Sequence, residues 1–338
     1  MQFHKLLIDR PFAFEAGGSL PRLEVAYHTS PRSYQPGDTV VWICHALTAN
    51  SDAEDWWPQM VGPGRLIDTD RYFVDCVNML GSPYGSSSPA SVNPETGAPY
   101  YLDFPRVTVR DIIRATIEVR KALGIPKVDL LVGSSIGGFQ ALEWAIQEPD
   151  VIVHAAFMAT SARVTPILTA YEESQRMALE ADPSIHACAS LKGGEAGLRC
   201  ARSIALISYR SFDGYYKTQQ DADPDTLFAD RACSYQRYQG KKLSDRFDAY
   251  CYWILSYSVD SANVGRGRGG VEKALGMIRA QTTVVAIDSD CIFPPQVMAP
   301  IAEAIPGASF HLIHSLFGHD GFLLETEQLS AILSPLLQ

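Results

Sequence analysis

Short runs of hydrophobic residues, rich in β-branched side chains, recur along the chain and predict the strands of a buried sheet. They lie at 39–44, 72–78, 128–133, 151–158, 282–287 and 309–313. Within each run the hydrophobic residues are nearly continuous, as in parallel strands covered on both faces. Helical periodicity separates several runs, most clearly over 108–123, which Gly124 and Pro126 bring to an end. This alternation predicts an α/β fold with a doubly wound, mostly parallel sheet.

The middle of the chain interrupts the alternation. Strand patterns are scarce from about 162 to 270, whereas helix-compatible stretches are frequent, and strands resume at Thr282. The simplest explanation is a helical insertion that covers the edge of the sheet at which the parallel strands end. We therefore predict a core domain made of 1–161 and 273–338, with a helical lid insertion at 162–272.

Composition narrows the possible partners and the compartment. The net charge is −10, which argues against nucleic acid as a partner because binding its backbone needs a basic surface. The hydrophobic runs are shorter than the ~20 residues of a membrane-spanning helix, so we expect no membrane association. The N-terminal segment lacks a secretory-signal pattern, and the seven cysteines show no C-x-x-C spacing. We expect a cytoplasmic protein with free thiols.

No pattern indicates a metal or a bound cofactor. The histidines and acidic residues do not form H-E-x-x-H or a similar ligand spacing, and no Walker loop is present. The GRGRGG segment at 265–270 lacks the preceding strand that a dinucleotide site needs, and its two arginines favour salt bridges or anion contacts. We therefore expect no metal site and no cofactor.

The sequence Gly133-Ser134-Ser135-Ile136-Gly137 follows a predicted strand and precedes a helical stretch. This is the G-x-S-x-G setting of a nucleophile elbow, in which the serine occupies a sharp and strained turn. The flanking glycines are needed because side chains there would collide with the neighbouring strand or helix. We predict that Ser135 is a catalytic nucleophile.

A serine nucleophile needs a base, and the base needs a carboxylate that orients it. In this type of fold they follow the serine in the order aspartate, histidine. His319 lies in a glycine-flanked loop after the last predicted strand, and Asp290 lies just beyond the strand before it. Asp288 is placed equally well, so spacing leaves the choice between the two aspartates open.

Two backbone N–H groups are expected to form an oxyanion hole. One belongs to Ile136, the residue after the nucleophile, and the other comes from the loop after an early strand, where Leu47 is the candidate. His45 stands in the same loop. We expect it to be structural and to hold this turn through a hydrogen bond.

An ordered series of longer motifs resembles the homoserine O-acetyltransferase family of methionine biosynthesis, whose members have the α/β-hydrolase fold. The series covers nearly the whole chain and includes CHALTAN (44–50), NPETGAPY (93–100), DFPRVTVRD (103–111), GSSIGGFQALEWA (133–145), CARSIALISYRS (200–211), VGRGRGG (264–270), SDCIFPP (289–295) and GHDGFL (318–323). The resemblance implies acetyl-CoA and L-homoserine as substrates, transfer of the acetyl group through an acyl-serine, and a homodimer formed through the lid.

The resemblance also assigns residues. It selects Asp290 rather than Asp288, because the family's acid lies in the SD-x-x-FPP segment. It implies that Arg202, Tyr209 and Asp320 bind the acceptor amino acid. A guanidinium can grip the acceptor's carboxylate through two hydrogen bonds, and a carboxylate can take its ammonium group.

Several positions depart from the family pattern and keep other substrates open. Ser134 and Ile136 stand where many members have glycine and methionine, and Ser261-Ala262-Asn263 replaces a His-Asp pair. The alternatives are a serine acceptor, a succinyl donor, or hydrolysis of an ester or thioester by the same three residues. Homoserine and serine differ by one methylene, which is worth only ~1–3 kcal/mol of discrimination.

Overall fold

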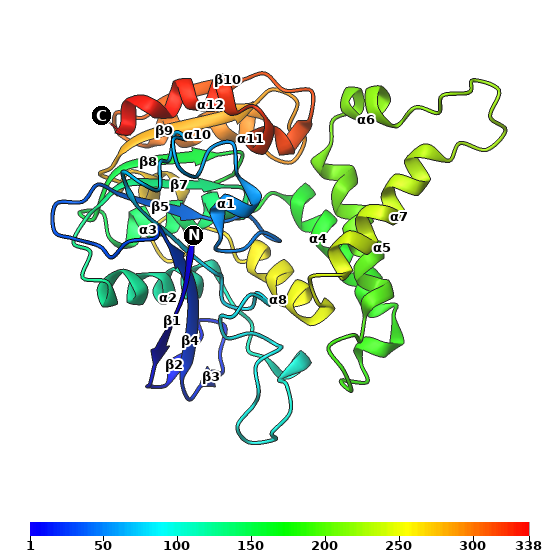
Figure 1. Ribbon diagram of the computed structural model, residues 1–338, viewed down its shortest axis with the longest axis horizontal. Coiled ribbons are helices and arrows are strands. Elements are labelled where there is room, and N and C mark those ends of the chain that lie inside the picture. Colours follow the sequence, from blue (N-terminus) through cyan, green and yellow to red (C-terminus); the bar gives the residue numbers. More distant parts are fainter. Residues whose placement is uncertain (338) are drawn as a thin grey trace.

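The structure, a computed structural model, describes residues 1–337, which form an eight-stranded sheet with helices on both faces (Figure 1). In spatial order the strands are β1 (Gln2–Ile8), β4 (Leu23–Thr29), β6 (Phe73–Val77), β5 (Val40–Cys44), β7 (Val128–Ser134), β8 (Ile152–Met158), β9 (Gln281–Ile287) and β10 (Ser309–Ile313). β4 pairs antiparallel with both β1 and β6, and the remaining pairs are parallel. This confirms the predicted doubly wound, mostly parallel sheet.

The six predicted strands are all present, and each end differs from its predicted position by at most one residue. β1 and β4 were not predicted. Residues of β1 alternate between exposed and partly buried positions, so this edge strand carries no continuous hydrophobic run. A separate two-stranded sheet joins β2 (Phe12–Ala13) to β3 (Ser19–Leu20).

Alternate residues of the central strands feed two hydrophobic clusters, one on each face of the sheet. Trp42 and Cys44 of β5 belong to the first cluster, and Val41 and Ile43 belong to the second. The first cluster packs against the helices α2 (Val109–Ala122), α3 (Ile136–Gln147) and α10 (Pro295–Ala304). The second packs against α1 (Ala53–Trp56), α11 (Gly321–Leu324) and α12 (Thr326–Leu333). Burial of both faces accounts for the continuous hydrophobic runs of these strands.

Helix α2 matches the predicted helix at 108–123. Its N-terminus is closed by a capping box, in which the Thr108 side chain accepts from the Asp111 N–H and the Asp111 side chain accepts from the Thr108 N–H. These two bonds satisfy groups that an uncapped helix would leave without partners.

The chain between β8 and β9 is mostly helical and extends to one side of the sheet (Figure 1). It contains α4 (Pro166–Glu180), α5 (Glu195–Tyr209), α6 (Phe212–Gln219), α7 (Arg231–Ser244) and α8 (Ala249–Asp260), and the short α9 (Val271–Leu275) leads back to the core. We call α4–α8 with their connections the lid. The domain boundaries at 161/162 and 272/273 stay a prediction. No helix among residues 1–337 is both long enough and apolar enough to cross a membrane.

Asp75 is an exception to the hydrophobic character of the core. It lies in the middle of β6, opposite Trp42 of β5, and is fully buried. Neither of its carboxylate oxygens has a hydrogen-bond partner among the described residues. Burial raises the pKa of Asp75 well above its ordinary value, because an unpaired charge is poorly solvated there.

We expect Asp75→Asn to stabilise the protein at pH 7 by at least about 1 kcal/mol, because the amide carries no charge to bury and does not have to be protonated on folding. The folded state holds the Asp75 proton more tightly than the unfolded chain does. The wild type therefore loses stability as pH rises above the unfolded pKa of aspartate, and the variant lacks this loss. Urea unfolding at pH 4.5 and pH 7 measures the effect. Equal differences between variant and wild type at both pH values would contradict it.

Candidate active site

Ser135 occupies the tight turn between β7 and α3. Its backbone has φ 58° and ψ −127°, a strained conformation for a residue with a side chain. Neighbouring groups hold it there. The Ser135 N–H donates to the carbonyls of Met158 (3.1 Å) and Ala159 (3.0 Å), and its own carbonyl accepts from the Thr160 hydroxyl (2.8 Å).

The flanking glycines allow backbones to approach closely around this turn. A methyl group at Gly133 would lie 2.2 Å from the Gly137 carbonyl oxygen, and one at Gly137 would lie 2.1 Å from the carbonyl oxygen of Cys44. Neither position can hold a side chain without moving the backbone. Helix α3 therefore begins directly against the end of β5, beside the loop that carries Leu47.

His319 and Asp290 meet in the core at the ends of two strands. The His319 Nδ1 donates to the Asp290 Oδ2 at 2.7 Å, and both side chains are buried. The other oxygen, Oδ1, accepts from the N–H groups of Ile292 (2.8 Å) and Phe293 (3.0 Å). Asp290 is thereby held in a single orientation, and Nε2 of the imidazole remains available as an acceptor.

Asp288, the alternative acid, lies elsewhere. Its carboxylate binds the exposed His314 at 2.9 Å and accepts from the Ser315 N–H at 3.0 Å. Geometry therefore favours Asp290 as the partner of His319, in agreement with the choice that the family resemblance implies.

The surroundings of His319 favour its charged form. Burial alone would lower its pKa, but the charge of Asp290 and the hydrogen bond to it, with a smaller contribution from Asp320, raise the pKa above its ordinary value. The aromatic rings of Tyr209, Phe293 and Phe322 lie 5.4–5.6 Å from the imidazole. The rings pack around a pair whose side chains are both buried.

Ser135 and His319 line one cavity of about 190 Å³, together with Leu47, Arg202 and Tyr209. Asp320 lines it as well, so the cavity collects most of the predicted site residues. Among residues 1–337 no hydrogen bond joins Ser135 to His319. In free enzymes this contact is often loose and tightens when substrate binds.

The two expected oxyanion donors are adjacent to this cavity. Among the hydrogen bonds of residues 1–337, none uses the N–H of Leu47 or of Ile136. His45 stabilises the loop that carries Leu47 through two hydrogen bonds. Its Nδ1 donates to the Ala46 carbonyl (2.9 Å), and its Nε2 accepts from the Met79 N–H (3.2 Å). Burial lowers the pKa of His45 to about 4, so the ring is neutral and structural, as predicted.

The predicted acceptor residues come from the lid and from the loop after β10. Arg202 and Tyr209 lie on α5, with the Arg202 guanidinium 5.4 Å from the centre of the Tyr209 ring. No carboxylate within the described chain lies within 4 Å of Arg202. Asp320 forms an ion pair of 2.6 Å with Arg210, which also brings the end of α5 to the loop that carries His319.

Comparison with known proteins agrees with this geometry. A family model described as the α/β-hydrolase fold matches residues 39–326. The homoserine O-acetyltransferase of Cyclobacterium marinum is 38% identical over 321 residues, which cover 95% of this chain and 91% of that protein. The chain belongs to the homoserine O-acetyltransferase family of α/β hydrolases.

Solved structures show the same fold. A homoserine O-acetyltransferase from Bacillus anthracis has a TM-score of 0.88 at 22% identity and covers 100% of this chain and 97% of its own. An acetylester hydrolase from Corynebacterium glutamicum has a TM-score of 0.86 at 23% identity, covering 99% and 95%. The fold shared by the homoserine O-acetyltransferase family therefore also occurs in a hydrolase.

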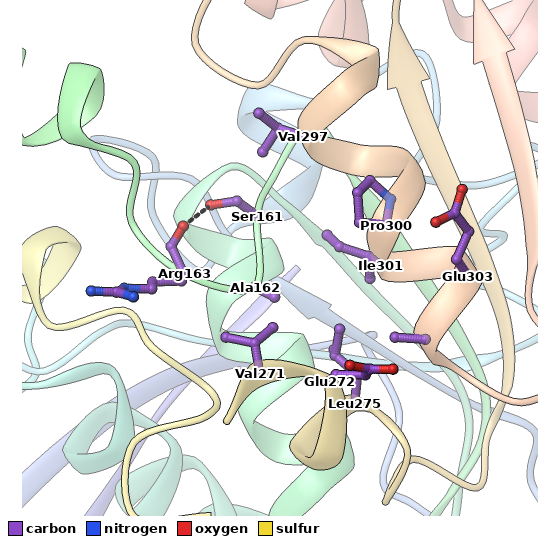
Figure 2. A pocket seen from close by; sticks show the side chains of 11 residues that line it. Ser161, Ala162, Arg163, Val271, Glu272, Leu275, Val297, Pro300, Ile301 and Glu303 are labelled. Atoms are coloured by element: carbon purple, nitrogen blue, oxygen red, sulfur yellow. Dashed lines mark hydrogen bonds between the residues drawn. The ribbon is translucent and has the colours of Figure 1, made fainter. Parts of the chain in front are cut away.

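A larger cavity of about 530 Å³ lies away from this site, between α9, α10 and the segment after β8 (Figure 2). Val271, Val297 and Ile301 line it, and none of the predicted catalytic residues does. Elsewhere in the chain, Arg266 and Arg268 of the GRGRGG segment form salt bridges with Glu15 and Glu143. No group of three or more possible metal ligands occurs in the described part of the chain.

Sequence reasoning missed Arg246, which also lines the site cavity. It belongs to the turn between α7 and α8, about 110 residues beyond Ser135. No local motif pointed to it, because its place at the cavity depends on how the lid packs against the core.

We expect Asp290→Asn to lower kcat for acyl transfer to Ser135 by about 10³–10⁴-fold, since the imidazole loses its orienting acceptor. A histidine that acts as a base must be neutral, so we expect the wild-type rate to rise with pH through the raised pKa of His319. Loss of the carboxylate charge lowers that pKa and moves the midpoint to lower pH. The pH–rate profile of p-nitrophenyl acetate cleavage measures both effects. Asp288→Asn is the matched control, and a large loss in that variant instead would overturn the assignment.

Proposed function

We propose that this chain is a homoserine O-acetyltransferase that transfers the acetyl group of acetyl-CoA to L-homoserine through an acetyl-serine at Ser135. The observation that carries the proposal is the shared cavity. It joins a strained serine, a buried His–Asp pair and a lid arginine without a carboxylate partner. Family membership supports the same activity. Acetyl-CoA is consumed as the acyl-donor substrate, and the proposed reaction uses no separate cofactor.

In the first half-reaction His319 Nε2 takes the proton of the Ser135 hydroxyl as the serine oxygen attacks the thioester carbonyl. The N–H groups of Leu47 and Ile136 bind the resulting oxyanion. The C–S bond then breaks, and CoA leaves with the proton from His319. Asp290 keeps the imidazole in the required tautomer and stabilises its charged form.

In the second half-reaction the carboxylate of homoserine binds Arg202, and its ammonium group binds Asp320 beside Tyr209. The side-chain hydroxyl gives its proton to His319 and attacks the acetyl-serine. Collapse of this intermediate restores Ser135 with the proton from His319 and releases O-acetylhomoserine. Arg202 is suited to this role because its guanidinium has no competing carboxylate nearby.

Transfer requires that the acceptor reach the acyl-serine before water does. The lid and the aromatic rings around His319 restrict the site, which favours transfer. Hydrolysis by the same residues is the second candidate, and the likeness to an acetylester hydrolase favours it. Serine as the acceptor and succinyl-CoA as the donor are narrower alternatives.

Release of free CoA from acetyl-CoA tests the proposal. We expect release to depend strongly on homoserine, to be slower by at least about 10-fold with serine, and to be lower still without an acceptor. Succinyl-CoA should be the poorer donor. Ser135→Ala is expected to abolish release, because no acyl-enzyme forms. Equal release with and without homoserine would identify a hydrolase, and near-normal transfer by Ser135→Ala would exclude the acyl-serine.

We further propose a cytoplasmic homodimer formed through the lid. The outer lid carries exposed apolar side chains, including Ile207 of α5, Phe212 and Tyr216 of α6, and Leu227 and Phe228 before α7. Of these segments, the connection between α6 and α7 lies at the end of the lid farthest from the sheet (Figure 1). Exposed apolar side chains of this kind suit contact with a second copy of the same chain.

The double substitution Leu227→Asp and Phe228→Asp is expected to convert the dimer to a monomer, because it places charges in the apolar contact. Light scattering coupled to size-exclusion chromatography gives the mass. Phe310→Asp, on the distant strand β10, is the matched control and should leave the mass unchanged. A monomeric wild type would contradict the proposal.

A further inference from the structure

Arg246 connects the lid to the loop that carries an expected oxyanion donor. It lies between α7 and α8, and its backbone N–H donates to the Leu243 carbonyl at 3.0 Å. The next residue, Phe247, is buried and packs against Tyr84 with ring centres 5.7 Å apart. The base of the Arg246 side chain is therefore held firmly, although much of the side chain is exposed.

The Arg246 guanidinium reaches the core through one nitrogen. Nη1 donates to the Thr48 carbonyl at 2.6 Å and also binds the Tyr84 hydroxyl. Among the hydrogen bonds of residues 1–337, this bond to Thr48 is the one that joins the lid to 45–51. A charged donor makes it stronger than a neutral hydrogen bond.

Thr48 directly follows Leu47 in a tight turn. The Ala49 N–H closes this turn on the Ala46 carbonyl at 3.0 Å, leaving Leu47 and Thr48 as its two central residues. On the core side His45 holds the same Ala46 carbonyl. Arg246 holds the opposite side of the turn, so the orientation of the free Leu47 N–H depends on an anchor from the core and one from the lid.

We propose that Arg246 is a positioning residue that aligns the Leu47 N–H with the developing oxyanion. Through the bond to Thr48 it makes this alignment depend on contact between the lid and the core. The inference rests on the proposed acyl-serine chemistry and not on which acceptor or donor is used. When the lid is displaced, the Thr48 carbonyl loses this anchor, and the turn is held only through the Ala46 carbonyl, which accepts from the Ala49 N–H and from His45. The oxyanion hole is then fully formed only when the lid contacts the core through Arg246.

Arg246→Ala is expected to lower kcat for acylation of Ser135 by p-nitrophenyl acetate about 10-fold with little change in KM. This is less than the ~10²–10³-fold loss from removing an oxyanion donor, because the Leu47 N–H remains present. Phenylboronic acid, which forms a tetrahedral adduct with the serine, should bind about 10-fold more weakly. Arg246→Lys, which retains one charged donor, should recover part of both losses.

Two controls separate other roles of the arginine. Arg279→Ala removes an exposed arginine that pairs with Asp150 and should change neither quantity. Tyr84→Phe removes the second partner of Nη1 but keeps the Thr48 bond and the ring packing, so it should have a small effect.

Three outcomes would overturn the proposal. Unchanged boronic acid affinity in Arg246→Ala would show that the oxyanion hole does not depend on the arginine. A rise in KM for acetyl-CoA with normal cleavage of p-nitrophenyl acetate would indicate direct binding of the donor. A loss of thermal stability with unchanged kcat would indicate a purely structural role. Because p-nitrophenyl acetate needs no amino-acid acceptor, these results stay distinct from a failure of homoserine-dependent transfer.

Discussion

The close approach of helix α3 to the ends of β7 and β5 is the constraint on which the site depends. Hydrogen at Gly133 and Gly137 lets the backbone of α3 meet carbonyl groups at distances that no side chain would permit. This contact places the first turn of α3 beside the loop after β5. The free N–H groups of Ile136 and Leu47 consequently belong to two segments that the contact holds together, and Ser135 lies beside them in strained backbone.

A second set of contacts supports the groups that would move protons. Asp290 is buried, but every side-chain oxygen has a partner: His319 binds one and two backbone N–H groups bind the other. Its charge is therefore stabilised within the core, in contrast to Asp75, whose burial has no such compensation. The difference explains why one buried aspartate can act on a neighbouring histidine while the other lies isolated in the sheet.

The lid completes the site from the opposite side. Arg202 and Tyr209 come from α5, Arg210 binds Asp320, and Arg246 binds the loop that carries Leu47. Residues of the core and of the lid therefore both line the cavity, and a few polar contacts join the two parts. Because residues of both parts line this cavity, the same contacts give a physical route by which lid position can affect chemistry.

The sequence by itself determined the parts of this protein that depend on local patterns. Continuous hydrophobic runs identified six strands, of which all but the edge strand β10 lie inside the sheet, because strands buried on both faces need apolar residues throughout. The glycines around Ser135 identified the elbow for a similar reason, since only they permit its turn.

Tertiary structure decided which residues meet. Spacing could not separate Asp288 from Asp290, because both follow the same strand and only the return of the chain through β10 brings His319 to one of them. The edge strand β1, its neighbour β4 and the cavity residue Arg246 were likewise decided by long-range packing, because none of them carries a continuous hydrophobic run or a local motif.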